Sequence, residues 1–132
     1  AHQFIQRLPL GYETQLGEHG EQLTPGQTFL LGLARAIIRN PAVIIIDEPT
    51  EALDQGTKNF LDDTYQRMSD QRTVVFIPTR LSTVRRCDRV VVIDEGRVES
   101  IGPQPELVKS CELYRHWEYV TFNVFRRSGE KG

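Results

Sequence analysis

The apolar and polar positions of this chain follow different periods in successive segments. Residues 1–22 are polar and interrupted by glycines, without a sustained helical or strand period, so we expect loops and short helices there. The next segment has a helical period and predicts a helix over about residues 25–39. Its apolar positions are Leu30, Leu31, Ala34, Ile37 and Ile38.

Both ends of this helix are marked in the sequence. Thr24 and Gln27 have the spacing of a capping box, in which each side chain bonds the backbone N–H of the other residue. Pro25 suits the first helical position, where a backbone N–H has no partner within the helix. Asn40 and Pro41 end the helix, because proline disfavours helical geometry in the residue before it.

A strand-like pattern follows and alternates with a second helical stretch. Residues 43–46 are a continuous β-branched run, which is typical of a strand buried on both faces of a parallel sheet. Residues 56–69 have helical character, and residues 73–77 form another apolar run, which Pro78 ends. Strand, helix and strand in this order predict an α/β sheet.

The second half of the chain predicts an antiparallel hairpin and a helical tail. A short helix near residues 82–86 precedes two apolar segments, 89–93 and 97–101, whose short connection predicts the hairpin. Residues 105–127 are amphipathic and predict one or two helices that pack on the body. Their larger apolar side chains include Leu107, Leu113, Tyr114, Trp117 and Phe122. The expected fold class is α/β, with a mixed, mainly parallel sheet flanked by helices.

Composition limits the class of protein. The chain has 132 residues, of which 39% are hydrophobic and 26% charged, and this suits one domain or part of a larger one. A net charge of −2 gives no broad basic field, so we do not expect nucleic acid as a partner. The longest apolar run, residues 42–46, is far shorter than the roughly 20 residues of a membrane-spanning helix, and no secretory signal pattern opens the sequence. Cys87 and Cys111 lack metal-ligand spacing, and we expect both to be reduced.

Two carboxylates follow the first predicted strand. Ligands of open α/β sheets collect outside the carboxyl ends of the strands, where Asp47 and Glu48 are expected to lie. Adjacent side chains at a strand end point in different directions, so one carboxylate could hold Mg²⁺, usually through water, while the other orients an attacking water. The structural alternative is that Asp47 caps the next element and Glu48 is solvated.

Short motifs over nearly the whole chain resemble the nucleotide-binding domain of exporter-type ABC transporters. In chain order, the matching segments are 8–14 and 17–18 before the signature, 23–27 at the signature, 33–36 in the helix after it, 43–48 at the Walker B strand and catalytic glutamate, 52–54 at the D-loop, and 80–84, 88–89 and 94–98 after the switch histidine. Each motif alone is weak, whereas their shared order and spacing are specific to this family.

The resemblance implies an ABC ATPase fold of the P-loop NTPase type and a role for each site residue. Asp47 would assist the Mg²⁺ site, and Glu48 would be the general base or orient the attacking water. Asp54, in the D-loop, would lie at the seam between two domains. The signature positions of the cofactor-binding segment are Thr24, Pro25, Gly26 and Gln27, and all but the proline would touch the γ-phosphate of ATP held by the partner domain.

The resemblance also implies which part of the domain this chain represents. The whole chain, 1–132, would be the C-terminal part of one ABC nucleotide-binding domain. Residues 1–40 would end its helical subdomain, 41–104 would hold Walker B, the D-loop and the switch region, and 105–132 would be the helical tail. Because the sequence contains no G-x-x-x-x-G-K-[ST] phosphate-binding loop, we expect little or no ATP binding by this chain alone. ATP and Mg²⁺ would need the upstream half of the domain or a partner.

Two positions depart from the family pattern. Pro25 replaces a signature glycine whose backbone N–H lies near the phosphate, and proline has no N–H to donate. Thr79 stands where the family has its switch histidine, and threonine cannot carry a positive charge towards the γ-phosphate. Because of these two substitutions, membership of the family does not by itself imply that the site hydrolyses ATP.

One function is favoured and two alternatives stay open. The favoured function is part of the ATP-hydrolysing domain of an ABC transporter. That domain would pair head to tail with a second nucleotide-binding domain and act with a transmembrane domain at the cytoplasmic face of the membrane. The first alternative is a degenerate regulatory or structural half-site that does not hydrolyse ATP itself, which Pro25 and Thr79 favour and the intact Asp47, Glu48 and Asp54 disfavour. The second is a soluble ABC protein of translation or DNA repair, whose long inserts and basic surfaces are absent.

Overall fold

The computed structural model describes residues 1–51 and 53–129, with side chains described up to residue 121. It divides into two compact units, Ala1–Ile77 and Pro78–Gly132, each of which is described by itself. Among the described residues, no helix combines the length and the apolar character needed to cross a membrane. Ala52 and the side chain of Phe122, which belong to the predicted D-loop and tail, lie outside the described part.

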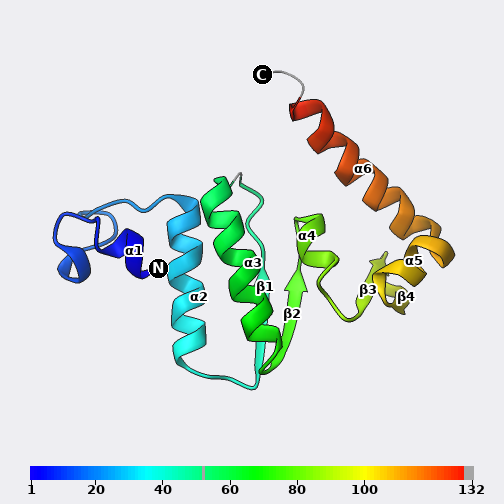
Figure 1. Ribbon diagram of the computed structural model, residues 1–132, viewed down its shortest axis with the longest axis horizontal. Coiled ribbons are helices and arrows are strands. Elements are labelled where there is room, and N and C mark those ends of the chain that lie inside the picture. Colours follow the sequence, from blue (N-terminus) through cyan, green and yellow to red (C-terminus); the bar gives the residue numbers. More distant parts are fainter. Residues whose placement is uncertain (52, 130–132) are drawn as a thin grey trace. The chain divides into compact units, whose positions relative to one another are not determined.

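The first unit contains a short helical N-terminal segment followed by an alternation of helices and strands (Figure 1). Its elements are α1 (His2–Ile5), the 3-10 helix η1 (Gly11–Glu13), α2 (Pro25–Ile38), β1 (Val43–Asp47), α3 (Gln55–Ser69) and β2 (Thr73–Ile77). The predicted helices and strands are confirmed to within one residue at each end. The agreement follows from the strong local signals, a capping box before α2 and a proline after each of α2 and β2.

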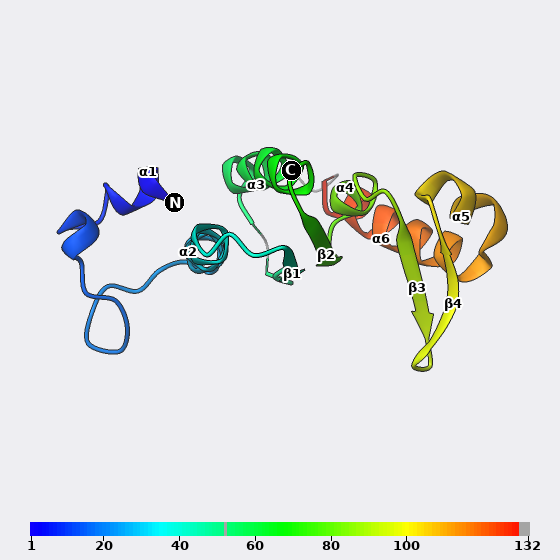
Figure 2. The ribbon, with the colours of Figure 1, turned by 90° about the horizontal axis from the view of Figure 1, so that it is seen from below.

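β1 and β2 form a two-stranded parallel sheet, in register from Val43 opposite Thr73 to Asp47 opposite Ile77. One face of this sheet packs against the helices, and Figure 2 shows α3 lying over it. The buried core of the unit consists of Leu33, Ile44, Ile46, Leu53, Leu61, Tyr65 and Met68. The ring of Tyr65 lies 4.8 Å from that of Phe76, centroid to centroid, which ties α3 to β2.

The prediction that the first strand is buried on both faces is wrong for this chain. Ile44 and Ile46 are buried, whereas Val43 and Ile45 on the opposite face are 53% and 70% exposed. Val75 and Ile77 of β2 extend the same exposed face. Both helices of the unit that pack on the sheet cover one side, so alternate residues of each strand have no cover within the described residues. A continuous apolar run therefore indicates that a strand favours burial on both faces. It does not indicate which segment covers each face.

The second unit combines a hairpin with helices (Figure 1). Its elements are α4 (Leu81–Val84), β3 (Val90–Asp94), β4 (Arg97–Gly102), α5 (Gln104–Ser110) and α6 (Glu112–Gly129). β3 and β4 are antiparallel, as predicted. Their two-residue turn places Glu95 at φ 45° and Gly96 at φ 75°, and two positive φ values match the right-handed twist of hairpin strands. Among the described residues, the parallel pair and the antiparallel pair are each a two-stranded sheet within its own unit.

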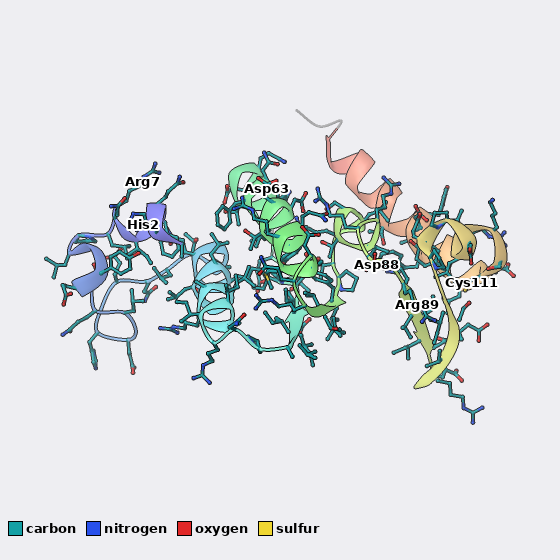
Figure 3. All side chains as sticks on the ribbon, turned by 60° about the horizontal axis from the view of Figure 1, so that its bottom comes forward. His2, Arg7, Asp63, Asp88, Arg89 and Cys111 are labelled. Atoms are coloured by element: carbon teal, nitrogen blue, oxygen red, sulfur yellow. The ribbon has the colours of Figure 1, made fainter. Side chains whose placement is uncertain are left out.

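The core of the second unit lies where α5 and α6 meet the hairpin. Val84, Leu107, Cys111 and Tyr114 are buried there, with Cys111 at the junction of α5 and α6 (Figure 3). The Cys87 thiol donates to the carbonyl of Thr83 at 3.3 Å. Of the apolar tail residues named from the sequence, Leu107, Tyr114 and Trp117 pack in this core, whereas Leu113 is exposed.

Candidate functional site

The candidate site lies where the strands of the first unit end and its helices begin. Because α2 and α3 run antiparallel to the strands that follow them, the N-termini of both helices lie on the same side as the carboxyl ends of β1 and β2 (Figure 1). This side of a parallel sheet is where ligands of α/β proteins bind. The predicted signature, Walker B and D-loop residues all map to it.

Asp47 and Glu48 stand at the carboxyl end of β1 in different environments. Asp47 is exposed, whereas Glu48 is 3% exposed. The backbone N–H of Glu48 donates a 3.0 Å hydrogen bond to the carbonyl of Ile77, which continues the parallel ladder by one residue beyond β1. The two carboxylates therefore differ in access to water, as the alternation of a strand requires. The idea that Glu48 is simply solvated does not fit its burial.

The N-terminus of α2 is closed by the predicted capping box. The Gln27 N–H donates to Thr24 Oγ1 at 3.2 Å, and the Thr24 N–H donates to Gln27 Oε1 at 2.9 Å. Pro25 occupies the first turn, as its fixed φ allows, and Gly26 beside it is buried. Thr24 and Gln27 thus bond each other in this structure, which fixes the shape of the loop that enters the helix.

The N-terminus of α3 is capped by Asp54. One oxygen of its carboxylate accepts from the backbone N–H of Thr57 at 2.9 Å, and the other accepts from the Thr57 hydroxyl. These bonds favour the charged carboxylate and hold the pKa of Asp54 below its ordinary value, the hydroxyl contributing most. The capping role was not predicted, although Asp-x-x-Thr is a spacing that could have indicated it.

The segments at the two helix N-termini lie close together. A β-carbon at Gly26 would lie 3.4 Å from Leu53 Cδ2 and 3.6 Å from Thr57 Cγ2, which are ordinary van der Waals distances. Leu53 is itself buried in the core of the unit. The structure therefore brings the segment at the predicted signature against the segment at the predicted D-loop. The sequence places these two segments in order but gives no sign that they lie close together.

Thr79, at the predicted switch position, belongs to the second unit. It is half-buried and lies in the bend between β2 and α4. Arg80, which follows it, precedes the first turn of α4 and donates from Nη2 to Thr83 Oγ1 at 3.1 Å. Thr79 is thus described within its own unit, and its predicted role at the switch position stays a prediction.

The carboxylates can be tested for their fit to Mg²⁺. Within the part of the chain that the structure describes, no cluster of three or more His, Cys, Asp or Glu side chains could hold a metal ion. Mg²⁺ commonly takes only one or two protein carboxylates and completes its shell with water and substrate phosphates. A single exposed carboxylate at Asp47 fits that kind of binding and does not fit a metal site made wholly of protein ligands.

Comparisons with known proteins agree with these motifs. The family described as ABC transporter matches residues 1–51. The chain is 44% identical over 114 residues to the cyclolysin secretion/processing ATP-binding protein CyaB of Bordetella pertussis, covering 86% of this chain and 16% of that protein. It is 42% identical over 112 residues to ABC transporter B family member 1 of Arabidopsis thaliana, covering 85% of this chain and 9% of that protein.

A solved structure is similar over the same extent. A bacterial Atm1-family ABC exporter with ATP bound matches with a TM-score of 0.77 and 36% identity, over 89% of this chain and 21% of that chain. The chain thus spans a small part of each relative, and the matched part is the one that carries the motifs at the carboxyl ends of the strands. The chain belongs to the ABC transporter family and is part of one of its nucleotide-binding domains.

Proposed function

We propose that this chain is part of an ATP-hydrolysing domain whose reaction drives transport across a membrane. The observation that supports the proposal is the pair of carboxylates at the carboxyl end of β1, Asp47 exposed and Glu48 buried, beside the N-termini of α2 and α3. The names of the relatives, an ATP-binding secretion protein and an ABC exporter, support it as well. The whole protein would act with a transmembrane domain at the cytoplasmic face of the membrane.

Each residue of the site has a task in this proposal. Asp47 would hold Mg²⁺ through one carboxylate and water, and Glu48 would orient the attacking water and accept its proton. Burial suits Glu48 to this task, because a base held out of bulk water keeps a fixed position. Bound ATP with Mg²⁺ would supply the phosphoryl group that the water attacks.

The proposal assigns the helix N-termini to a partner. Thr24, Gly26 and Gln27 would face ATP held by a second nucleotide-binding domain in a head-to-tail pair, and Asp54 would lie at the seam. The proximity of Gly26 to Leu53 and Thr57 supports this arrangement, because it places the signature and D-loop segments beside each other. Two neighbouring segments can together complete a site on another domain.

The experiment replaces Glu48 with glutamine in the full-length protein that contains this chain. Mg²⁺-dependent phosphate release should fall by about 100-fold or more, because a positioned base typically contributes 10²- to 10⁴-fold. The matched control is Glu51→Gln, which removes an exposed carboxylate three positions further along the same loop and should leave the rate unchanged. A rate that survives Glu48→Gln would contradict the assignment of the base.

A second candidate is a degenerate half-site that pairs with an active domain without turning over ATP. Pro25 favours it, because the first turn of α2 lacks one backbone donor towards an anion. Thr79 favours it too, since it offers a hydroxyl where the family has an imidazole. Full-length protein that binds nucleotide but releases no phosphate would support this candidate over the first.

Restoring the family residues separates the two effects. Pro25→Gly and Thr79→His should each raise phosphate release, the first by adding a backbone N–H and the second by adding a donor that can be charged. If neither substitution changes the rate, neither position limits the reaction.

A further inference from the structure

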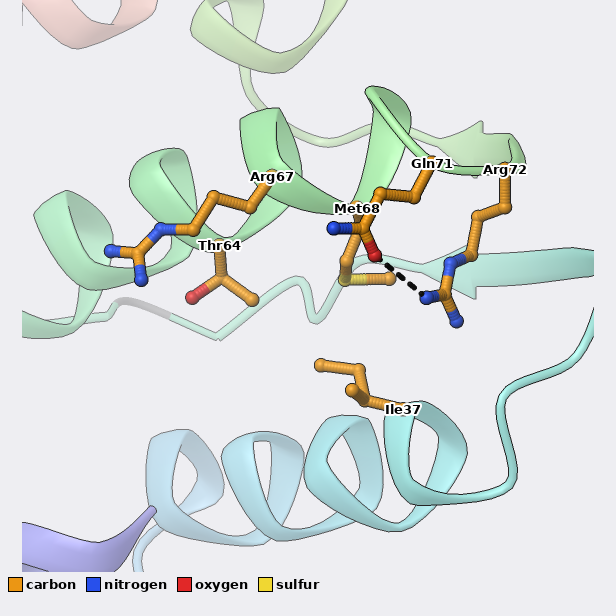
Figure 4. Close-up of a pocket in the computed structure, with 6 residues that line it drawn as sticks. All are labelled: Ile37, Thr64, Arg67, Met68, Gln71 and Arg72. Atoms are coloured by element: carbon orange, nitrogen blue, oxygen red, sulfur yellow. Dashed lines mark hydrogen bonds between the residues drawn. The ribbon is translucent and has the colours of Figure 1, made fainter.

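Buried polar atoms also lie outside the site at the strand ends. In the first unit, a hollow between α2 and α3 is lined by Ile37, Thr64, Arg67, Met68, Gln71 and Arg72 (Figure 4). Arg72 Nη2 donates to Gln71 Oε1 at 3.3 Å, and the side chain of Arg67 points away from it. The other two nitrogens of Arg72 are shut off from solvent, so this hollow presents no paired charges to a ligand. In the second unit, Thr83 is a polar residue that is only 1% exposed.

Thr83 is joined to Arg80 by two hydrogen bonds. Its backbone N–H donates to the carbonyl of Arg80 at 3.1 Å, and its Oγ1 accepts from Arg80 Nη2 at 3.1 Å. The N–H of Val84 donates to the same carbonyl at 3.4 Å. Arg80, which directly precedes α4, is therefore held to that helix by both its backbone and its side chain.

The helix that holds Arg80 is itself anchored. Val84 is 2% exposed and packs in the core of the second unit with Leu107 and Tyr114. The thiol of Cys87 donates to the carbonyl of Thr83 at 3.3 Å, which adds a bond on the other side of the helix turn. Because Thr83 is buried, water cannot readily replace its hydroxyl as the acceptor for Arg80.

Arg80 connects this anchored helix to the predicted switch position, since Thr79 is the residue before it. Each residue has only two soft backbone dihedrals, so a fixed Arg80 restricts where Thr79 can lie. A displacement of about 1 Å in a group near reacting atoms can cost about 100-fold in rate. Bonds made one residue away from such a group can therefore influence the reaction.

We propose that Thr83 is a positioning residue for ATP hydrolysis, whose hydroxyl acts through Arg80 to hold Thr79 in place. This inference rests on the proposed function, in which Thr79 offers its hydroxyl towards the γ-phosphate. The burial of Thr83 and its bonds to Arg80 are the observations that carry it.

The first test measures phosphate release by the full-length protein with Thr83→Val, which keeps the shape of the side chain and removes only the hydroxyl. The kcat should fall by roughly three- to tenfold, the range that one hydrogen bond is worth. The KM for ATP should stay unchanged, because a contact that forms in the transition state does not alter binding of the ground state. Thr83→Ser keeps the hydroxyl and should restore kcat. An unchanged kcat in Thr83→Val, or no recovery in Thr83→Ser, overturns the proposal.

A double-mutant cycle tests whether Thr83 acts through Thr79. In a Thr79→Ala background, Thr83→Val should have no further effect on kcat, because the group that it positions is already gone. The same loss in both backgrounds would show that Thr83 acts by another route and would overturn the proposal. Ser82→Ala, which removes an exposed hydroxyl from the same turn, is the matched control and should leave kcat unchanged.

Amide hydrogen exchange separates this proposal from the proposed function, because it needs no turnover. The N–H groups of Thr83 and Val84 both bond the carbonyl of Arg80, so peptides covering 79–87 should exchange about threefold faster or more in Thr83→Val. Thr83→Ser and Ser82→Ala should exchange as the wild type does. If the wild type releases no phosphate, the proposed function fails, and the exchange alone decides whether the Thr83 hydroxyl holds this segment. If Thr83→Val does not fold, Thr83→Ala replaces it with the same readouts, and wild-type exchange in the folded variant overturns the proposal.

Discussion

Thr24 fixes the first turn of α2 through two reciprocal hydrogen bonds with Gln27. Thr24→Ala removes one of them and leaves the backbone N–H of Gln27 without its acceptor. The free energy of unfolding should fall by about 1 kcal/mol, the usual cost of losing an N-cap side chain. Chemical denaturation of the variant measures it. The control is Thr28→Ala, an exposed position of the same helix, where a change within about 0.5 kcal/mol is expected.

Asp54 makes the cap of α3 sensitive to acid. Its pKa is lowered from 3.8 by the hydroxyl and the N–H of Thr57, so the stability that it contributes is present above pH 3.8. That contribution is lost as the pH falls below 3.8 and through the lowered pKa of the folded protein. Asp54→Asn keeps an acceptor for Thr57 but does not titrate.

The measurement compares the unfolding free energies of the wild type and Asp54→Asn between about pH 6 and pH 2. The wild-type advantage should be constant in the upper part of this range and shrink below pH 3.8. A difference that stays the same at every pH would show that the titration of Asp54 is not linked to folding.

Contacts between residues close in sequence could be predicted, whereas those between distant residues could not. The capping box of Thr24 and Gln27 was predicted, because both partners lie within four residues and the motif is local. The proximity of Gly26 to Leu53 was not, because residues far apart in the chain meet only once the helices pack on the sheet. The burial of Glu48 likewise depends on its surroundings in the folded unit and not on its neighbours in sequence.

At the scale of elements, the two faces of β1 should respond differently to substitution. Ile46 is 4% exposed and packs in the core under the helices, whereas Ile45 faces the other way. Ile46→Ala should lower the unfolding free energy of the chain by about 2–5 kcal/mol. Ile45→Ala should cost less than about 1 kcal/mol, because little apolar area becomes newly exposed. Equal costs, measured by denaturant unfolding, would contradict the one-sided packing.

The burial of Tyr114 between the helices of the second unit should make the free energy of unfolding fall at alkaline pH. Burial raises the pKa of Tyr114 above 10.0, and the carboxylate of Glu118 raises it further. A raised pKa in the folded state means that stability is full below pH 10.0 and is lost as the pH rises through the higher value of the folded protein. Tyr114→Phe removes the ionising group and should flatten this loss. Unfolding free energies measured at a series of pH values above neutrality test it, and equal alkaline losses in both proteins would refute it.

Elements were predicted well where their signals are local. β2 begins and ends at the predicted residues, because Pro78 ends it and a β-branched run begins it. The hairpin of β3 and β4 was predicted because a two-residue turn with Gly96 joins two apolar segments. The prediction that failed was burial on both faces of β1. Burial depends on which other segments pack on the strand, and the residues of the strand do not specify those segments.

At the scale of the whole molecule, the order of the motifs identified the family before any packing was known. The family match and the similarity to a solved exporter confirm that identification. The roles of Thr24, Pro25, Gly26, Gln27, Asp47, Glu48, Asp54 and Thr79 remain predictions. The grouping of the strands into two separate pairs was not predictable from order alone, because strands adjacent in sequence need not be hydrogen-bonded neighbours.

The two-stranded sheets have a practical consequence for work with this chain. Each pair has two outer strands whose outward N–H and C=O groups bond no other strand among the described residues. In β1 and β2 these groups lie beside the uncovered Val43, Ile45, Val75 and Ile77. Unpaired backbone next to bare β-branched side chains is a template for strand addition between copies. The isolated polypeptide is therefore at risk of aggregation. Its production calls for a solubility tag or for a longer segment of the protein.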